Sequence, residues 1–338
     1  MKVTNSFQFV KIEAGPRHCI GKSNDNWYIW GEHIKLGDYN SALKEEIICN
    51  PIEIHLQIRV ISVSCGFEHT LFLDDEGKVH GFGKNNHGQL IPNDKKLKAI
   101  SQPTFINLEK PVQFIAASTR GSFFITKSLQ VYVQGSNKNL ELGLTSEQSH
   151  QCGFLEIQNV TSVNAGFKHT VFLSKLHDSA QLYGCGSNKF GQLSISSLSD
   201  KNQLQLIPLP DIIPKDFDVL TSWNNTALIY KIEDSLQLYL TGDNKYGQLG
   251  NGDKTQFSNA FVPVDIPKGI KFNKVQAMAE AFIATDNEGQ LYTWGWNEHG
   301  NLGHGDTLNR NVPTKVEKGG TLEQGQSIAC AGAYFMIY

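Results

Sequence analysis

The chain repeats itself with a period of 49 to 56 residues, and one short pattern marks each repeat. The pattern is a small residue, then a bulky one, then His-Thr or a substitute, as in AGPRHC, CGFEHT and AGFKHT. Its seven copies are counted from Gly15, Gly66, Ala117, Gly166, Ser222, Met278 and Gly332. A fixed period of this length is typical of tandem arrays in which each unit packs only against its neighbours.

A second pattern keeps the same period. It is an alternating strand that ends in glycine, as in YIWG, HGFG, YVQG, YGCG, YLTG and YTWG. The final glycines are Gly31, Gly83, Gly135, Gly186, Gly242 and Gly295. Because two independent patterns stay in register over six units, the repeat covers the whole chain.

Each unit has the sequence pattern of a small antiparallel sheet. Apolar or alternating stretches such as VISVSCG, HTLFLD and KVHGFG are separated by turn signals such as DDEG and DNEG. A three- or four-stranded unit cannot bury its own face, so the units must stack, and radial stacking gives a propeller. The sequence therefore predicts an all-β, seven-bladed β-propeller. We expect a single domain over residues 1–338, with about six full repeats and a C-terminal half repeat.

The two ends bear on how the last blade is completed. The apolar tail AYFMIY follows the last copy of the first pattern, and we expect it to be a buried strand that closes the final blade. Only residues 1–6 precede the first inner strand, FQFVKIEA. Two alternatives follow: the seventh blade is incomplete, or the first segment of the chain is missing.

Composition and charge exclude several classes of protein. The 338 residues are 40% hydrophobic, and the net charge is -3 without a basic tail or a long apolar run. These features predict a soluble protein of the cytoplasm, with the nucleus as a second compartment, that binds neither nucleic acid nor membrane directly. Six scattered cysteines without a CxxC pair indicate reduced, mostly buried thiols rather than a zinc site.

No pattern of residues predicts catalysis, a cofactor or a metal. The segment GPRHCIGKS has five residues between its glycines, where a phosphate-binding loop needs four, and no GxSxG is present. The recurring histidines are His18, His69 and His169. Their counterparts Arg120, Asn225, Ala281 and Phe335 cannot complete a coordination shell, so we expect each histidine to hydrogen-bond backbone within its own blade. The chain is therefore predicted not to be an enzyme.

The two repeat patterns together resemble the regulator of chromosome condensation repeat. Its signatures are G-F-x-H-T, found in residues 66–70 and 166–170, and Y-x-W-G-x-N-x-x-G-Q-L-G. The glycine-rich part of the second signature runs through residues 242–253 and 295–306, with Asn301 for the glutamine in the latter, and is partial in GKNNHGQL and GSNKFGQL. The resemblance implies the propeller fold. This family includes an exchange factor for the small nuclear GTPase Ran, plant photoreceptors and stand-alone scaffolds. The chain has no basic arm, no large insertion and no tryptophan cluster, which favours the scaffolds.

The stretch WGWNEHGN is similar to one in the short propellers of the yeast killer-toxin-insensitivity type, also called the alpha-tubulin suppressor type. That resemblance implies a non-catalytic adaptor. Its partner would be a small metal-carrying protein that serves diphthamide synthesis and Elongator-dependent modification of the tRNA wobble uridine. The alternative is an exchange factor or regulator of a small Ran-like GTPase. In either case we expect a monomer within a heteromeric complex.

Two tryptophans are the main candidates for contact with a partner, because binding hot spots favour aromatic residues. Trp296 stands where other repeats carry Lys84, Ser136, Ser187 or Asp243, and Glu298 and His299 follow in the same loop. Packing between blades is the alternative role of Trp296. Trp223 is a second candidate, although its counterparts Phe67 and Phe167 favour a place in the core.

Overall fold

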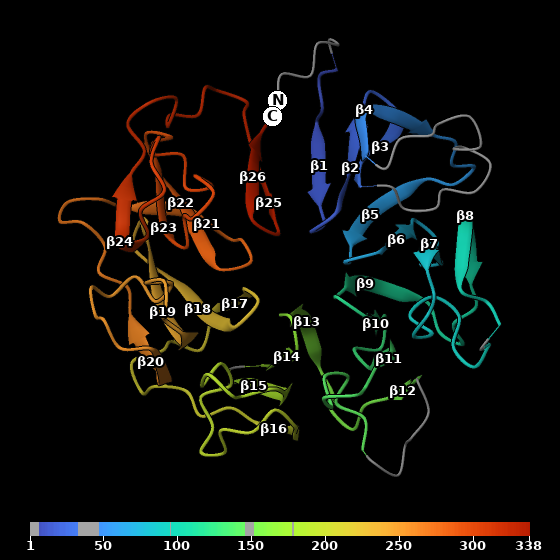
Figure 1. The fold of residues 1–338 in the computed structure, drawn as a ribbon. Helices are drawn as coiled ribbons and strands as arrows, with labels where there is room; N and C mark the ends of the chain where they lie inside the picture. Colours follow the sequence, from blue (N-terminus) through green and yellow to red (C-terminus); the bar gives the residue numbers. More distant parts are fainter. Residues whose placement is uncertain (1–6, 33–46, 95, 146–151, 178) are drawn as a thin grey trace. The chain divides into compact units, whose positions relative to one another are not determined.

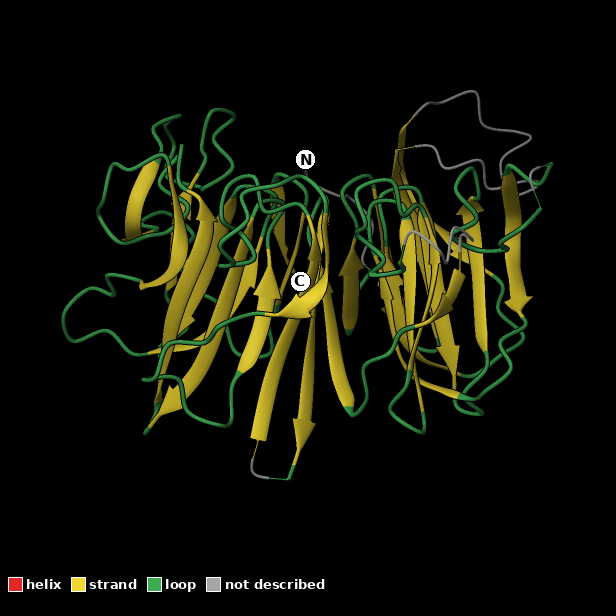
Figure 2. Cartoon of the chain, turned by 90° about the horizontal axis from the view of Figure 1, so that it is seen from below, coloured by secondary structure: helices red, strands yellow, loops and turns green. Residues whose placement is uncertain are grey.

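The computed structural model describes residues 7–32, 47–94, 96–145, 152–177 and 179–338, and all of these form strands, turns and loops (Figures 1 and 2). The chain divides into two compact units, residues 1–137 with 144–162 and 338, and residues 138–143 with 163–337. No helix long and apolar enough to cross a membrane occurs among the described residues.

The first unit contains three antiparallel sheets of four strands, one for each of the first three repeats. Their strands are β1 (Lys11–Ala14), β2 (His18–Ser23), β3 (Asn26–Glu32) and β4 (Ile47–Ile54); β5 (Val60–Cys65), β6 (His69–Asp74), β7 (Val79–Lys84) and β8 (Ala99–Ile106); and β9 (Val112–Ala117), β10 (Gly121–Thr126), β11 (Val131–Gly135) and β12 (Cys152–Phe154). Each sheet follows chain order, as the repeat predicts.

The second unit contains three further four-stranded sheets and one two-stranded sheet. The strands are β13 (Val160–Ala165), β14 (His169–Leu176), β15 (Ser179–Gly186) and β16 (Asn202–Leu206); β17 (Asp218–Thr221), β18 (Asn225–Ile232), β19 (Ser235–Asp243) and β20 (Phe257–Pro263); β21 (Phe272–Ala277), β22 (Ala281–Asp286), β23 (Leu291–Gly295) and β24 (Arg310–Lys315); and β25 (Ile328–Ala331) with β26 (Tyr334–Ile337). The seventh sheet is thus half the size of the other six.

The predicted C-terminal strand is β26, which pairs with β25. Its side chains are half-buried rather than buried, and Ile337 is exposed. All six cysteines are free thiols, and three of them are buried, fewer than the sequence predicts. Cys19, Cys65 and Cys185 are buried, whereas Cys49 is exposed.

The glycine that ends the third strand of each blade lies opposite the first residue of the second strand. Gly295 pairs with Ala281, and its φ is +105°. A Cβ at Gly295 would lie 2.5 Å from the carbonyl oxygen of Glu280, so only glycine fits here. This requirement explains why the second sequence pattern always ends in glycine.

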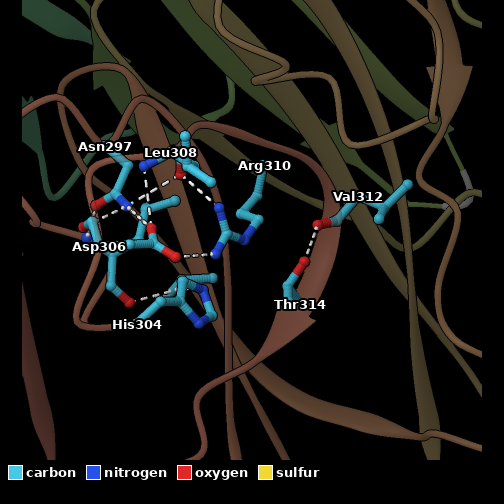
Figure 3. A network of polar contacts seen from close by, with 9 residues as sticks. Asn297, His304, Asp306, Leu308, Arg310, Val312 and Thr314 are labelled. Atoms are coloured by element: carbon cyan, nitrogen blue, oxygen red, sulfur yellow. Dashed lines mark hydrogen bonds and ion pairs between the residues drawn. The ribbon is translucent and has the colours of Figure 1, made fainter.

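The asparagine of the N-x-x-G-Q-L motif holds the long loop that follows this glycine. The Asn297 Nδ2 donates to the carbonyl oxygens of Asp306 and Leu308 at 3.0 Å each, and its Oδ1 accepts from the Leu302 N–H at 2.8 Å (Figure 3). Arg310 adds an ion pair of 2.7 Å with Asp306. Asn244 forms the equivalent bonds in the preceding blade. The loops are therefore fixed by a buried amide.

The recurring histidines connect neighbouring blades. His169 Nε2 lies 3.2 Å from the Thr226 hydroxyl of the next blade, and that hydroxyl donates to the carbonyl oxygen of Gln192 at 2.7 Å. Because the Thr226 proton is already used, His169 Nε2–H must be the donor to Thr226. His18 and His69 reach the next blade in the same way, at 2.7 Å from Thr70 and 3.0 Å from Ser122. The prediction of backbone bonds within each blade was wrong.

The predicted counterpart of these histidines in the third blade, Arg120, was also wrong by one position. Gly121, not Arg120, pairs with the strand-ending glycine of its blade, as His69 does in the preceding blade. Arg120 therefore occupies the turn position of Glu68. The sequence pattern is ambiguous here because the third repeat, AASTRG, contains neither the histidine nor the usual glycine.

Aromatic side chains fill the core of the sixth blade. Trp294 is fully buried and stacks on Phe282, with ring centroids 5.6 Å apart. Its indole N–H donates to the carbonyl oxygen of Gln248 in the preceding blade at 3.0 Å. This bond connects the loop that follows β19 to strand β23.

Candidate partner-binding site

The four predicted site residues lie around one turn of the second unit, residues 278–280, which joins β21 to β22. The backbone N–H of Trp223 donates to the Ala279 carbonyl oxygen, and that of Trp296 to the Glu280 carbonyl oxygen, both at 2.9 Å. Glu298 and His299 extend from the loop that begins with Trp296. The backbones of the two tryptophans are thus hydrogen-bonded to two consecutive residues of a single turn.

Trp296 is half-buried and has neighbours on two loops. Its ring lies edge-on to His299, with centroids 5.0 Å apart, and 6.3 Å from the ring of Tyr246 in the preceding blade. Its indole N–H donates to Glu298 Oε2 at 3.2 Å. Trp296 therefore packs between blades and keeps part of its surface in solvent, while Glu298 and His299 are exposed.

Tyr246 and Lys245 complete this group, although no prediction from the sequence included them. The Lys245 ammonium lies 4.9 Å from the centroid of the Tyr246 ring, a cation–π contact. Lys189 and Phe190 form the same kind of pair one blade earlier, at 5.7 Å. The sequence therefore contained a signal for this cation–π contact, a lysine followed by an aromatic residue at the same position of two repeats.

Trp223 lies at the surface rather than in the core. It is half-buried, and its ring is 5.3 Å from that of Phe167, which is 36% exposed. Backbone bonds run from Phe167 to Trp223, from Trp223 to Ala279 and from Ala279 to Gly332. Residues at or next to the bulky position of the first sequence pattern thus connect neighbouring turns of the second unit through backbone hydrogen bonds.

Glu280, whose carbonyl oxygen accepts from the Trp296 N–H, carries a poorly solvated carboxylate. Its Oε1 accepts from the Asn224 amide at 3.0 Å, and its Oε2 accepts from the Gln248 amide at 2.8 Å. Burial raises the pKa of Glu280 to about 7, despite the hydrogen bond from Gln248, and the nearby Asp243 adds to the increase. Burial also raises the pKa of Asp243. Two acids whose pKa values are raised by burial therefore lie close to each other.

The arrangement of these groups is suited to recognition of a surface. Amide donors hold Glu280, and Tyr246 and His299 pack against Trp296. No group of three metal-ligating side chains close enough to hold an ion occurs in the part of the chain that the structure describes. Two pockets of about 570 and 330 Å³ lie in the first unit, and neither is lined by the predicted residues.

Comparisons with known proteins place the chain among propellers. A family model described as the RCC1-like domain matches residues 1–337. The ultraviolet-B receptor UVR8 of Arabidopsis thaliana is 26% identical, over 94% of this chain and 72% of its own length. The secretion-regulating guanine nucleotide exchange factor of Mus musculus is 28% identical, over 80% of this chain. The alignment covers 62% of the mouse protein, which is less than two thirds of its length.

The structure of Prp20p from Saccharomyces cerevisiae has a similar fold. It superposes with a TM-score of 0.81 at 19% identity, over 97% of this chain and 81% of Prp20p. The prediction of an all-β propeller is confirmed, with six four-stranded blades and a seventh sheet of two strands in place of seven complete blades. Repeat register, blade structure and family match agree, and the chain belongs to the RCC1-like domain family.

Proposed function

We propose that this chain is a non-enzymatic, protein-binding propeller whose partner docks on an aromatic surface formed by Trp223, Tyr246, Trp296 and His299. The observation that carries the proposal is that Tyr246 and His299 pack on Trp296, on loops held by the buried amides of Asn244 and Asn297. The turn of residues 278–280 bonds the backbones of both Trp296 and Trp223. Partly exposed aromatic side chains on rigid loops supply contact area at a low entropic cost, and such residues dominate the energetics of protein interfaces.

The first candidate partner is a small metal-carrying protein of diphthamide synthesis and Elongator-dependent tRNA modification. Support comes from the stretch WGWNEHGN, which carries the resemblance to the killer-toxin-insensitivity propellers and also contributes Trp296, Glu298 and His299 to the aromatic surface. In this role the chain would be a monomeric adaptor in a heteromeric complex of the cytoplasm and nucleus. The metal would belong to the partner.

The second candidate function is regulation of a small Ran-like GTPase. It is favoured by the mouse relative, which is named a guanine nucleotide exchange factor, and by Prp20p, whose structure was described with its binding to Gsp1p and histones. In this role the chain would bind the nucleotide-free GTPase and release it when GTP enters.

One pair of assays separates the two candidates. Isothermal titration calorimetry of the purified chain against the small metal-carrying protein tests the adaptor, and release of fluorescent GDP from a Ran-type GTPase tests the exchange factor. Whichever partner binds, Trp296→Ala should weaken binding by about tenfold or more, because truncation of a central aromatic anchor costs about 2 kcal/mol. Absence of binding and of exchange would contradict both candidates.

The matched control is Phe105→Ser. Phe105 is 46% exposed and lies on β8 of the first unit, so its replacement removes an exposed aromatic ring away from the proposed site. The proposed site requires unchanged partner affinity in this variant. Equal losses in both variants would mean that aromatic surface in general, and not this group, determines the affinity.

A further inference from the structure

Each four-stranded blade has two equivalent positions whose residues are joined by a backbone hydrogen bond. The residue after the strand-ending glycine donates its backbone N–H to the carbonyl oxygen of the turn between the first two strands. The pairs, with the turn residue first, are Arg17 and Glu32, Glu68 and Lys84, Arg120 and Ser136, Lys168 and Ser187, Asn224 and Asp243, and Glu280 and Trp296. This backbone bond makes the blades directly comparable.

In the first unit the acid at this turn is neutralised within the chain. Glu68 forms an ion pair with Lys84 of its own blade. Its Oε1 also accepts from Arg17 of the preceding blade at 3.4 Å. Two cations at two defined repeat positions therefore compensate this partly buried carboxylate.

In the second unit the same acid has neither cation. The preceding blade presents Asn224 in place of Arg17, and this amide donates to Glu280 at 3.0 Å. Trp296 replaces Lys84. Glu280 forms no ion pair with any residue that the structure describes, although a cation at the position of Lys84 would be in reach.

The charged groups around Glu280 increase the contrast with Glu68, because they include two further acids. Asp243 is 7% exposed and forms no ion pair with a described residue, and Glu298 stands exposed at the Trp296 ring. An opposing charge comes from Lys245, which is exposed and lies over the Tyr246 ring. Around Glu280 and Trp296 there are thus three carboxylates and one ammonium group, while a second ammonium group, Lys168, lies 5.8 Å from the ring of Phe167, which packs on Trp223. The excess of acid around Glu280 is complementary to a basic partner.

We propose that the partner supplies a lysine or arginine side chain that pairs with Glu280 and lies against the ring of Trp296, where Lys84 lies beside Glu68. A cation at this point compensates a desolvated carboxylate and gains a cation–π contact with an indole face. Leaving a poorly solvated acid without a counter-charge costs free energy that such a partner recovers. This inference rests on the proposed docking surface and specifies the chemistry that the surface recognises.

The test uses a random library of 12-residue peptides in mRNA display, selected on the full-length chain. Lysine and arginine should be enriched together at one peptide position, and replacement of that residue by citrulline or norleucine should weaken binding by about tenfold or more. Selection on Glu280→Gln, which keeps the shape of the side chain, should lose the enrichment. Trp296→Lys should lose it as well, because its own ammonium then takes the place of the ligand.

The matched control is Glu68→Gln, which removes the equivalent acid of the first unit and should leave the enrichment intact. Basic residues that remain enriched on Glu280→Gln, or acidic residues enriched on the unmodified chain, would overturn the inference. Peptides that require Trp296 but tolerate Glu280→Gln would preserve the docking surface and refute the basic side chain. If no selected peptide depends on Trp296 or Glu280, both proposals fail.

Discussion

The backbone N–H of Trp296 lies 2.9 Å from the carbonyl oxygen of Glu280, and the side chains of these two residues occupy the positions that Lys84 and Glu68 hold in the first unit. The repeat therefore keeps the backbone geometry and replaces an internal ion pair by an aromatic ring beside an uncompensated acid.

The two tryptophans on either side of Gly295 should differ sharply in their effect on stability. Trp294→Ala should lower the free energy of unfolding by about 3–5 kcal/mol, because this fully buried ring leaves a large cavity. Trp296→Ala should cost about 1 kcal/mol or less, because its ring is partly in solvent. Urea unfolding followed by circular dichroism measures both values. Equal losses would show that Trp296 is a core residue.

Glu280 should make the chain less stable as the pH rises. Its pKa is about 7 in the folded chain and near 4.5 when unfolded, so between these values the folded state holds more protons. The free energy of unfolding therefore decreases from pH 4.5 to 7. Asp243 adds to the increase in the pKa of Glu280, and Lys245 opposes it. The neighbouring side chains of Glu298 and His299 are exposed.

The variant that isolates this contribution is Glu280→Gln. Relative to the unmodified chain it should gain about 3 kcal/mol at pH 8 and about 1 kcal/mol or less at pH 5, measured by urea unfolding at both values. Glu13, whose pKa burial also raises to about 7, is present in both proteins and cancels in the comparison. A difference between the two proteins that does not change with pH would show that Glu280 does not titrate in this range.

The buried histidines should have the opposite pH dependence. Burial lowers the pKa of His169 to about 4, whereas the unfolded value is near 6.5, so the unfolded state binds more protons between these values. The free energy of unfolding therefore decreases as the pH falls from 6.5 to 4. His169→Asn introduces the residue that the fifth blade carries at this position and should flatten the profile over that range. An unchanged acid profile would contradict a buried, neutral His169.

The sequence predicted the blades because two periodic patterns specify strands and turns locally. It also identified the loop of Trp296, since the conserved geometry of the repeat made one substitution stand out. Tyr246, Gln248 and Asn224 were missed because they reach Trp296 and Glu280 from the preceding blade, so no spacing along the chain indicates their contact. The partner of His169 was missed for the same reason, because Thr226 belongs to the following blade.

The loop amide gives a further prediction. Asn297→Ala removes the bonds to Asp306, Leu308 and Leu302 and should lower the free energy of unfolding by about 2–3 kcal/mol. Amide hydrogen exchange of Leu302 should become faster. Asn251→Ala, on the corresponding loop of the fifth blade, is the control and should leave this exchange unchanged. Slow exchange at Leu302 in both variants would show that the amide does not hold the loop.

The most direct test of the docking surface is hydrogen–deuterium exchange of the chain with and without a purified binding partner. Binding at the aromatic surface should slow exchange in residues 243–248, 278–280 and 296–302, and leave the first unit unchanged. Slower exchange confined to the first unit, or to the hairpin turns at the other end of the blades, with no change at Trp296 and Glu280, would contradict the account.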